Sequence, residues 1–447
     1  MEQNSSTTQA VVSPPLKGAR SALILLLLIN LFNYIDRQVL AAVESDIQKE
    51  FFPTHPRDAE FWMGMLATAF MVTYMIAAPI FGWLADRTSR WIIVGASVLL
   101  WSVATGGSGL AALFGGFGLL MATRALVGVG EAGYGPAAPT LISDFYPVER
   151  RGAVLAWFYM AIPVGSALGY GIGMVIAQHF HWSRAFYAVV APGIVLGIVA
   201  LFMRDPPRGQ ADVPGTAGHG APKVTAKMGD YLVLLRIPSY LLDCAGMAAM
   251  TFAIGGISYW MPRYLVDVRH VGEKGTVGLI FGGITVVSGL SSTLLGGLVG
   301  DYVRRWIPSS YFLVSGIGIL IACPFLLLMI HSQGIWLWTF LFIAEFFLFF
   351  NTGPSNTVLA NVTHPSVRAT AFALNILVIH ALGDAISPPL LGWIGHTSWN
   401  QAFGVVAAMM AAAGVFWLWG CRYLERDTAL APTRLGERGF DVIGNAR

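Results

Sequence analysis

Charge is scarce in this sequence: Asp, Glu, Lys and Arg together make up 11% of its 447 residues, whereas 55% are hydrophobic. A soluble protein of this length needs far more charge to cover its surface. Cysteine is also scarce, and Cys244, Cys323 and Cys421 show no paired spacing, so neither a disulfide framework nor a metal site is expected. The shortage of charge therefore indicates a protein that crosses a membrane several times.

Motifs for nucleotide chemistry are also missing. No G-x-x-x-x-G-K-[ST] sequence occurs, so this chain is not expected to hydrolyse ATP. Gly128, Gly130 and Gly133 spell G-x-G-x-x-G, but they lie in a long apolar stretch, where glycines permit close helix contact, and not after a strand. We therefore expect no enzyme, no cofactor, no bound metal and no nucleic-acid partner.

What the sequence does contain is a series of apolar stretches, each long enough to cross a bilayer, which takes about 20 residues in a helix. Unpaired backbone groups are intolerable in lipid, so each stretch should be helical. We predict an all-α membrane protein with twelve transmembrane helices. Their predicted limits are 21–43, 61–84, 91–112, 115–143, 152–178, 184–203, 238–262, 275–299, 307–330, 334–362, 366–395 and 399–421.

One long polar break divides these stretches into six and six. Residues 204–230 are rich in Pro, Gly and charge, which is typical of a linker, and Met228 to Ile237 could form a short helix on the membrane surface. The predicted organisation is an N-terminal tail at 1–20, a first bundle at 21–203, a linker at 204–237, a second bundle at 238–421 and a C-terminal tail at 422–447.

The two bundles repeat each other in sequence. GWLADRTSRW at 82–91 matches GGLVGDYVRRW at 296–306, GP at 135–136 matches GP at 353–354, and WSRAF at 182–186 matches WNQAF at 399–403. Two parallel six-helix repeats with a site at their interface, near the middle of the membrane, are a known transporter design.

The basic residues predict the orientation. The tails and the connections on the same side carry 19 of the 27 Lys and Arg residues, whereas the opposite loops carry 5. Because cytoplasmic segments are enriched in Lys and Arg, both termini are expected in the cytoplasm, and the protein in the cell membrane.

Asp36 and Arg37 are unusual because they lie near the centre of the first apolar stretch. Each ionised group at that depth costs about 2.5–3.5 kcal/mol, so a functional use is expected. Adjacent residues point about 100° apart on a helix, so one of the two can line a cavity while the other meets a neighbouring helix. A structural ion pair between helices is the alternative.

Several motifs carry a family resemblance. GWLADRTSR and RALVGVGEA resemble the loop between helices 2 and 3 and the helix 4 motif of the major facilitator superfamily. INLFNYIDRQVLAAV, GVGEAGYGPAAPTLISDFYPVERRG with FYMAIPVGSALGY, and HALGDAISPPLLGW resemble its spinster branch, in a bacterial-type member. The resemblance implies two pseudo-symmetric bundles and the transport of sphingolipid or lysophospholipid species.

The resemblance also implies roles for buried charges. In this superfamily helices 1 and 4 are neighbours, and helix 4 supplies Glu131 here. We expect Glu131 and Asp36 to compete for Arg37, so that moving Arg37 switches which acid holds a proton; a static Arg37–Glu131 bridge is the alternative. Arg124 matches the helix 4 Arg, implying proton transfer or headgroup binding, with a packing salt bridge as the alternative.

Further candidates follow from the same resemblance. In the superfamily the loop after helix 2 latches the cytoplasmic gate, which assigns that role here, with solvated topology charges as the alternative. The gate candidates are Gly82, Asp86, Arg87 and Arg90, with Asp301, Arg304 and Arg305 in the second half. The weaker cavity candidates do not all depend on the resemblance: they are Tyr34 and the polar residues Glu345, Asn351, His380 and Asp384 in the apolar stretches of the second half. His380 and Asp384 are four residues apart, so they could bond along one helix face, and HALGDAISP matches the spinster pattern; structural hydrogen bonding is the alternative.

Together these features predict a monomeric secondary active transporter that works by alternating access and is coupled to protons. The expected substrate is an amphipathic lipid such as a lysophospholipid or a sphingolipid-like molecule. Proton-coupled drug efflux or organic-anion transport is the alternative within transport, and a membrane enzyme or receptor is the alternative outside it.

Overall fold

The computed structural model describes residues 16–85, 87–114, 116–206, 233–364 and 367–433 of the chain. These residues are almost entirely helical, and no strand occurs among them. The predicted linker and both tails fall largely outside the described residues. Of the predicted surface helix at 228–237, the described part contains one 3₁₀ turn, Leu234–Arg236.

The long helices follow the predicted apolar stretches. They are α1 (Ala19–Phe51), α2 (Ala59–Ala85), α3 (Arg90–Phe114), α4 (Gly116–Phe145), α5 (Val148–His179), α6 (Ser183–Leu201), α8 (Pro238–Arg263), α9 (Lys274–Arg304), α10 (Ser310–His331), α11 (Gly334–Phe349), α12 (Thr352–Val362), α13 (Arg368–Ile379), α14 (Ser387–Thr397) and α15 (Trp399–Leu430). α1 extends well beyond its predicted end at residue 43, and α15 extends beyond residue 421.

Eleven spans in the described part of the chain are long and apolar enough to cross a membrane. In that count α11 and α12 together form one span, Gly334–Val362. Most of α13 and all of α14 together form another, Thr370–Thr397. α4 is the twelfth predicted span. With 30 residues it has the length of a spanning helix, but it carries Arg124, Glu131, Pro136 and Pro139, which make it less apolar.

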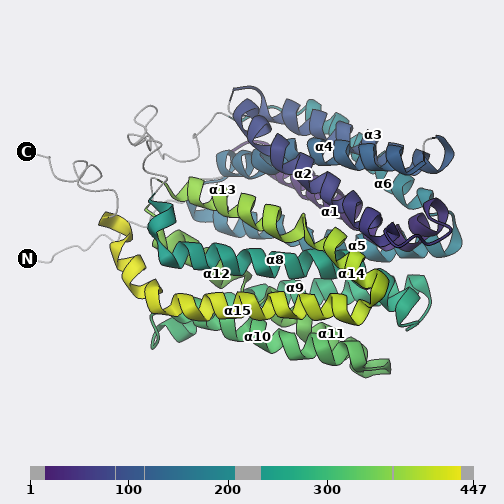
Figure 1. Ribbon diagram of the computed structural model, residues 1–447. Coiled ribbons are helices and arrows are strands. Elements are labelled where there is room, and N and C mark those ends of the chain that lie inside the picture. The colour runs from purple at the N-terminus through teal and green to yellow at the C-terminus, as the bar shows by residue number, and fades with distance from the viewer. Residues whose placement is uncertain (1–15, 86, 115, 207–232, 365–366, 434–447) are drawn as a thin grey trace, which may run out of the picture.

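Figure 1 shows most of the first six helices, coloured purple to blue, in its upper part and most of the remaining helices, coloured teal to yellow, in its lower part. The start of α1 and the end of α15 lie at the same end of the molecule. We call the opposite end the far end; it is formed by the connections at 52–58, 180–182, 269–273 and 332–333 and by residue 398. The halves meet along three helix pairs: α1 with α8, α2 with α14, and α5 with α9.

Two of the spans in the second half are interrupted near their middle. α11 gives way to α12 at Phe350 and Asn351, and a π-helical turn, His380–Asp384, joins α13 to α14. Such π turns are frequent at functional sites, because they redirect the side chains around them. The interruption places His380 and Asp384 beside the first half.

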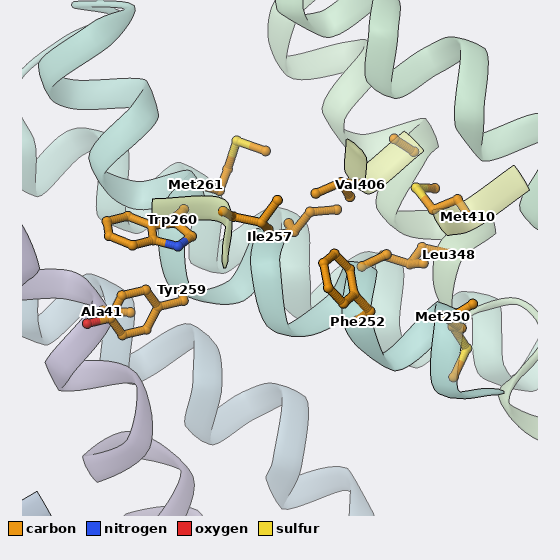
Figure 2. Packing of buried hydrophobic residues seen from close by; sticks show 14 of the residues in the cluster. Ala41, Met250, Phe252, Ile257, Tyr259, Trp260, Met261, Leu348, Val406 and Met410 are labelled. Carbon is orange, nitrogen blue, oxygen red and sulfur yellow. The ribbon is translucent and has the colours of Figure 1, made fainter. Parts of the chain in front are cut away.

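A continuous apolar core joins the halves towards the far end. It contains Tyr259 and Trp260 of α8 together with Ala41 of α1. Figure 2 shows Tyr259 lying against Ala41, with Trp260 and Ile257 on the same helix. The Tyr259 hydroxyl also donates a hydrogen bond to the backbone carbonyl of Met63 on α2, at 2.5 Å. The far end is therefore closed by packing between the two halves.

Candidate functional site

Arg37 and Glu131 form an ion pair inside the first half. Arg37 Nε donates to Glu131 Oε2 at 2.6 Å, which joins α1 to α4. The Glu131 side chain is fully buried, whereas the Arg37 side chain is 22% exposed. Arg37 is thus the member of the pair that solvent or a substrate can reach.

Asp36 faces away from Glu131 and has two partners of its own, Arg124 and Thr105. Its Oδ1 lies 3.7 Å from Nη1 of Arg124 on α4, and its Oδ2 accepts a hydrogen bond from Thr105 of α3 at 2.5 Å. Asp36, Arg124 and Thr105 are all buried. The two adjacent residues of α1 therefore point in different directions, as helix geometry requires, and each acid is paired with a different arginine.

Several polar atoms of these two ion pairs form no hydrogen bond. Among the described residues, Asp36 Oδ1, Glu131 Oε1, and Nε and Nη1 of Arg124 are buried and have no hydrogen-bond partner. A buried polar atom without a partner costs about 1–3 kcal/mol, so each of these four atoms could gain a further hydrogen bond.

Aromatic rings surround the exposed part of Arg37. Its guanidinium carbon lies 5.0 Å from the ring centres of Tyr34 and Phe70 and 5.5 Å from that of Tyr74. Rings at this distance stabilise a cation through their electron-rich faces. Tyr34, one of the weaker candidates, thus contacts Arg37.

Tyr74 lies between Arg37 and a residue of the second half. Its ring centre lies 6.4 Å from the ring of His380, and His380 Nδ1 lies 3.0 Å from both carboxylate oxygens of Asp384. The structure therefore places His380 and Asp384 next to the Arg37 group, across the interface between the halves.

Glu345 and Asn351 lie apart from this group. Glu345 is buried in α11, and its Oε2 accepts from the hydroxyls of Thr285 and Ser288, each at 3.3 Å. A small cavity adjoins it, lined mainly by apolar residues of α8, α9 and α11. Asn351 is fully buried, and its amide donates to the backbone carbonyl of Leu348 at 2.7 Å, where α11 ends.

The gate candidates of the first half form bonds within that half. Arg90 Nη1 donates to Asp144 Oδ2 at 2.5 Å, and the backbone N–H of Arg90 donates to Asp205 at 2.9 Å. Arg87 donates to the carbonyl of Trp83 at 3.1 Å, and a Cβ on Gly82 would lie 3.9 Å from Pro136. Asp86 lies outside the described residues.

The repeat's counterpart has a similar local arrangement. The Tyr311 hydroxyl donates to Asp301 Oδ1 at 2.7 Å, and Arg304 Nη1 donates to the same hydroxyl at 3.3 Å. The guanidinium of Arg305 lies 5.5 Å from the ring of Tyr302. These residues lie, like Gly82, Arg87 and Arg90, at the end opposite the far end, and their described bonds remain within one half.

Sequence reasoning missed a group of charges at the far end. Arg263 of α8 binds Glu44 Oε1 at 3.0 Å and Glu60 Oε1 at 3.1 Å, and His396 Nδ1 lies 3.1 Å from Glu60 Oε2. Arg263 and His396 belong to the second half, whereas Glu44 and Glu60 belong to the first. We call these four residues the far-end latch.

Further polar contacts join the halves beside the latch. Lys274 pairs with Asp46, and Lys49 lies 3.5 Å from Asp267. The backbone N–H of Gly275 donates to Gln178 at 2.6 Å. The basic residues among them could be found in the sequence, but only as loop charges that set the orientation.

Comparisons with known proteins agree on a family. The Major Facilitator Superfamily model matches residues 26–388. The chain is 35% identical over 378 residues to Protein spinster of Drosophila melanogaster, covering 82% of this chain and 60% of that protein. It is 36% identical over 415 residues to Protein spinster homolog 1 of Rattus norvegicus, covering 87% of this chain and 76% of that protein.

A solved structure shows the same fold. The crystal structure of a bacterial homolog to the human lysosomal transporter spinster, in an inward-facing and unoccupied conformation, superposes with a TM-score of 0.74. The sequence identity is 21%, and the superposition covers 94% of this chain and 99% of that chain. Transport by alternating access through a multi-pass membrane fold accounts for all of these matches. The chain belongs to the major facilitator superfamily and, within it, to the spinster transporters.

Proposed function

We propose that this transporter moves an amphipathic lipid, such as a lysophospholipid or a sphingolipid-like molecule, and couples that movement to protons. The observation that carries the proposal is the double ion pair of α1 and α4. It combines two buried acids with two arginines and leaves polar atoms of the group without hydrogen bonds. A static structural bridge would need one acid and one base.

The geometry of Arg37 supports the proposed proton coupling. A guanidinium can bind a phosphate through a planar pair of donors, and the exposed part of Arg37 is available to a headgroup. A headgroup that draws Arg37 away from Glu131 leaves a buried carboxylate without its cation. A proton taken up by Glu131 removes that cost, because a buried neutral acid is far cheaper than a buried charge.

The amphipathic lipid is supported by the spinster relatives and by the surroundings of Arg37. One cation lies among the rings of Tyr34, Phe70 and Tyr74, which suits a molecule with one charged end and a long apolar part. A small soluble anion would need more than one polar partner for its other groups.

The orientation belongs to the same proposal. With both termini in the cytoplasm, the far end, which the far-end latch holds closed, faces the outside of the cell membrane. The protein would act as a monomer, since each chain has both halves of the site.

Transport in proteoliposomes tests the proposal. We would measure lysophospholipid movement with and without a pH gradient for the wild type, for Asp36→Asn and for Glu131→Gln. Asp58→Asn is the control, because Asp58 is an exposed acid at the far end. Gradient-driven movement should occur in the wild type and the control and should lose its gradient dependence in the two buried-acid variants.

The other outcomes separate the alternatives. Equal movement without a gradient in the wild type would show a passive facilitator with structural acids. If no lipid moves under any condition while a panel of organic anions or drugs does, the substrate class is wrong and the alternative within transport is correct.

A further inference from the structure

α3 carries four buried hydroxyl side chains, at Ser97, Ser102, Thr105 and Ser108, and Thr105 is the one whose hydroxyl bonds a carboxylate. Ser108 bonds the hydroxyl of Thr123 on α4 at 2.9 Å as well as the carbonyl of Ala104 at 3.3 Å. Ser102 donates back to the carbonyl of Val98, four residues earlier, at 2.7 Å. This is the usual local bond of a hydroxyl within a helix. Thr105, between them, instead donates out of its helix to Asp36, at 2.5 Å.

This bond distinguishes the two oxygens of Asp36. Oδ2 is occupied by the Thr105 hydroxyl, whereas Oδ1 faces Nη1 of Arg124 at 3.7 Å without a hydrogen bond. Thr105 is fully buried, so water does not compete for its proton. The carboxylate is therefore oriented by one hydrogen bond to Oδ2, whereas Oδ1 accepts none.

We propose that Thr105 is a positioning residue that directs a proton taken up by Asp36 to its Oδ1. This inference rests on the proposed proton coupling. The step is a simple addition: a proton binds Oδ1, the carboxylate becomes a neutral acid, and Oδ2 remains the carbonyl oxygen that accepts from Thr105. Arg124 keeps its charge and its protons throughout.

The choice of Oδ1 has a mechanical effect. A protonated Oδ1 presents a donor to the guanidinium of Arg124, which also has only donors. Proton uptake and the Asp36–Arg124 ion pair then exclude each other. Without Thr105 the carboxyl group could rotate, take the proton on the oxygen remote from Arg124, and keep that contact.

Among the described residues, three charged groups interact electrostatically with Asp36. Arg124 on α4 lies closest, Arg37 is its neighbour on α1, and Glu131 on α4 is the acid that Arg37 binds. Thr105 is the uncharged contact, from α3. Replacing Thr105 leaves all three charges in place, so a changed proton affinity reports on the hydroxyl.

Infrared difference spectroscopy of the reconstituted full chain tests this inference without any transport step. The carboxylic C=O band of Asp36 is identified by its loss in Asp36→Asn and is followed as a function of pH. Thr105→Val removes the hydroxyl at nearly constant volume, Thr105→Ser keeps it, and Ser102→Ala is the control on the same helix.

We expect two changes in Thr105→Val. The band should persist to higher pH by about one to two units, because a hydrogen bond to the ionised acid has been lost. It should also move to higher frequency, because the carbonyl oxygen has lost its donor. Thr105→Ser and Ser102→Ala should match the wild type in both respects.

Three outcomes would overturn the inference. They are an unchanged band in Thr105→Val, an equal change in Thr105→Ser, which would indicate packing by the methyl group, and the absence of any Asp36 band at all pH values. Failure of the proposed function is separate, since it would appear as gradient-independent lipid movement in the wild type.

Discussion

Arg263 is expected to hold the far end closed, and its removal should shift the protein towards the state that is open there. Arg263 is the cation of the far-end latch, and its bonds to Glu44 and Glu60 cross between the halves. The side chain of Glu44 is fully buried. Arg263→Ala therefore leaves a buried carboxylate without a cation, but only while the far end is closed.

The expected change in the ratio of closed to open states can be calculated, because only the closed state keeps Glu44 buried without a cation. Removing one partner of a buried pair costs about 3–5 kcal/mol, and opening the far end to water relieves that cost. Since about 1.4 kcal/mol is a factor of ten in an equilibrium constant, the ratio of the two states should change by roughly two to three and a half powers of ten.

Distances between spin labels measure this ratio. Labels at Thr54→Cys and Asn400→Cys, exposed positions at the far end of the two halves, should report a longer distance in Arg263→Ala than in the parent. The parent would carry Ser at Cys244, Cys323 and Cys421. Adding Glu44→Gln to Arg263→Ala should reverse part of the change, because it removes the stranded charge.

Arg269→Ala provides the matched control. Arg269 is also an arginine near the far end, but its bonds go to the carbonyls of Ile330 and Ser332, within its own half. The reasoning is refuted if Arg263→Ala leaves the distance unchanged, or if Arg269→Ala lengthens it as much.

Three further predictions concern other parts of the structure. Arg37→Met should lower the melting temperature of the purified protein by stranding Glu131, and adding Glu131→Gln should restore most of it; no recovery in the double variant would contradict the ion-pair explanation. Gly64→Ala should open the far end in the spin-label assay, because its Cβ would collide with the backbone of Pro388 and Pro389, whereas Gly283→Ala, with nothing within 4 Å, should not. Trp417→Phe should destabilise the second half by about 1–3 kcal/mol, since it removes the donor to the buried Oδ1 of Asp243, at 2.9 Å; an unchanged melting temperature would show that this bond contributes nothing.

The sequence predicted the helices well because the apolar stretches of a membrane protein are long and the lipid permits few alternatives. It placed the end of the first span too early, at residue 43. Beyond Val43 the chain becomes polar, with Glu44, Ser45, Asp46 and Gln48, yet α1 continues to Phe51. The helix persists because several of these side chains are buried against the second half, a tertiary effect that hydropathy does not contain.

For the candidate site, too, the sequence predicted the charged residues but not which of them contact each other. Asp36, Arg37, Arg124 and Glu131 stood out because charge inside an apolar stretch is costly. Which acid meets which arginine depends on the rotation of each helix about its axis, and that is set by packing. Thr105 carried no signal at all, because a threonine in an apolar helix usually bonds to its own backbone.

The two halves repeat each other in sequence, but the paired charges belong to one of them. At an offset of 217 residues, Asp36 and Arg37 correspond to Ala253 and Ile254. The proposed exchange of partners between α1 and α4 would therefore take place within the first half, and it could act on the second half only through contacts that join the two. The ring of Tyr74, between Arg37 and His380, is such a contact. Tyr74 therefore links the ion pairs of the first half to the His380–Asp384 pair of the second half through a single aromatic side chain.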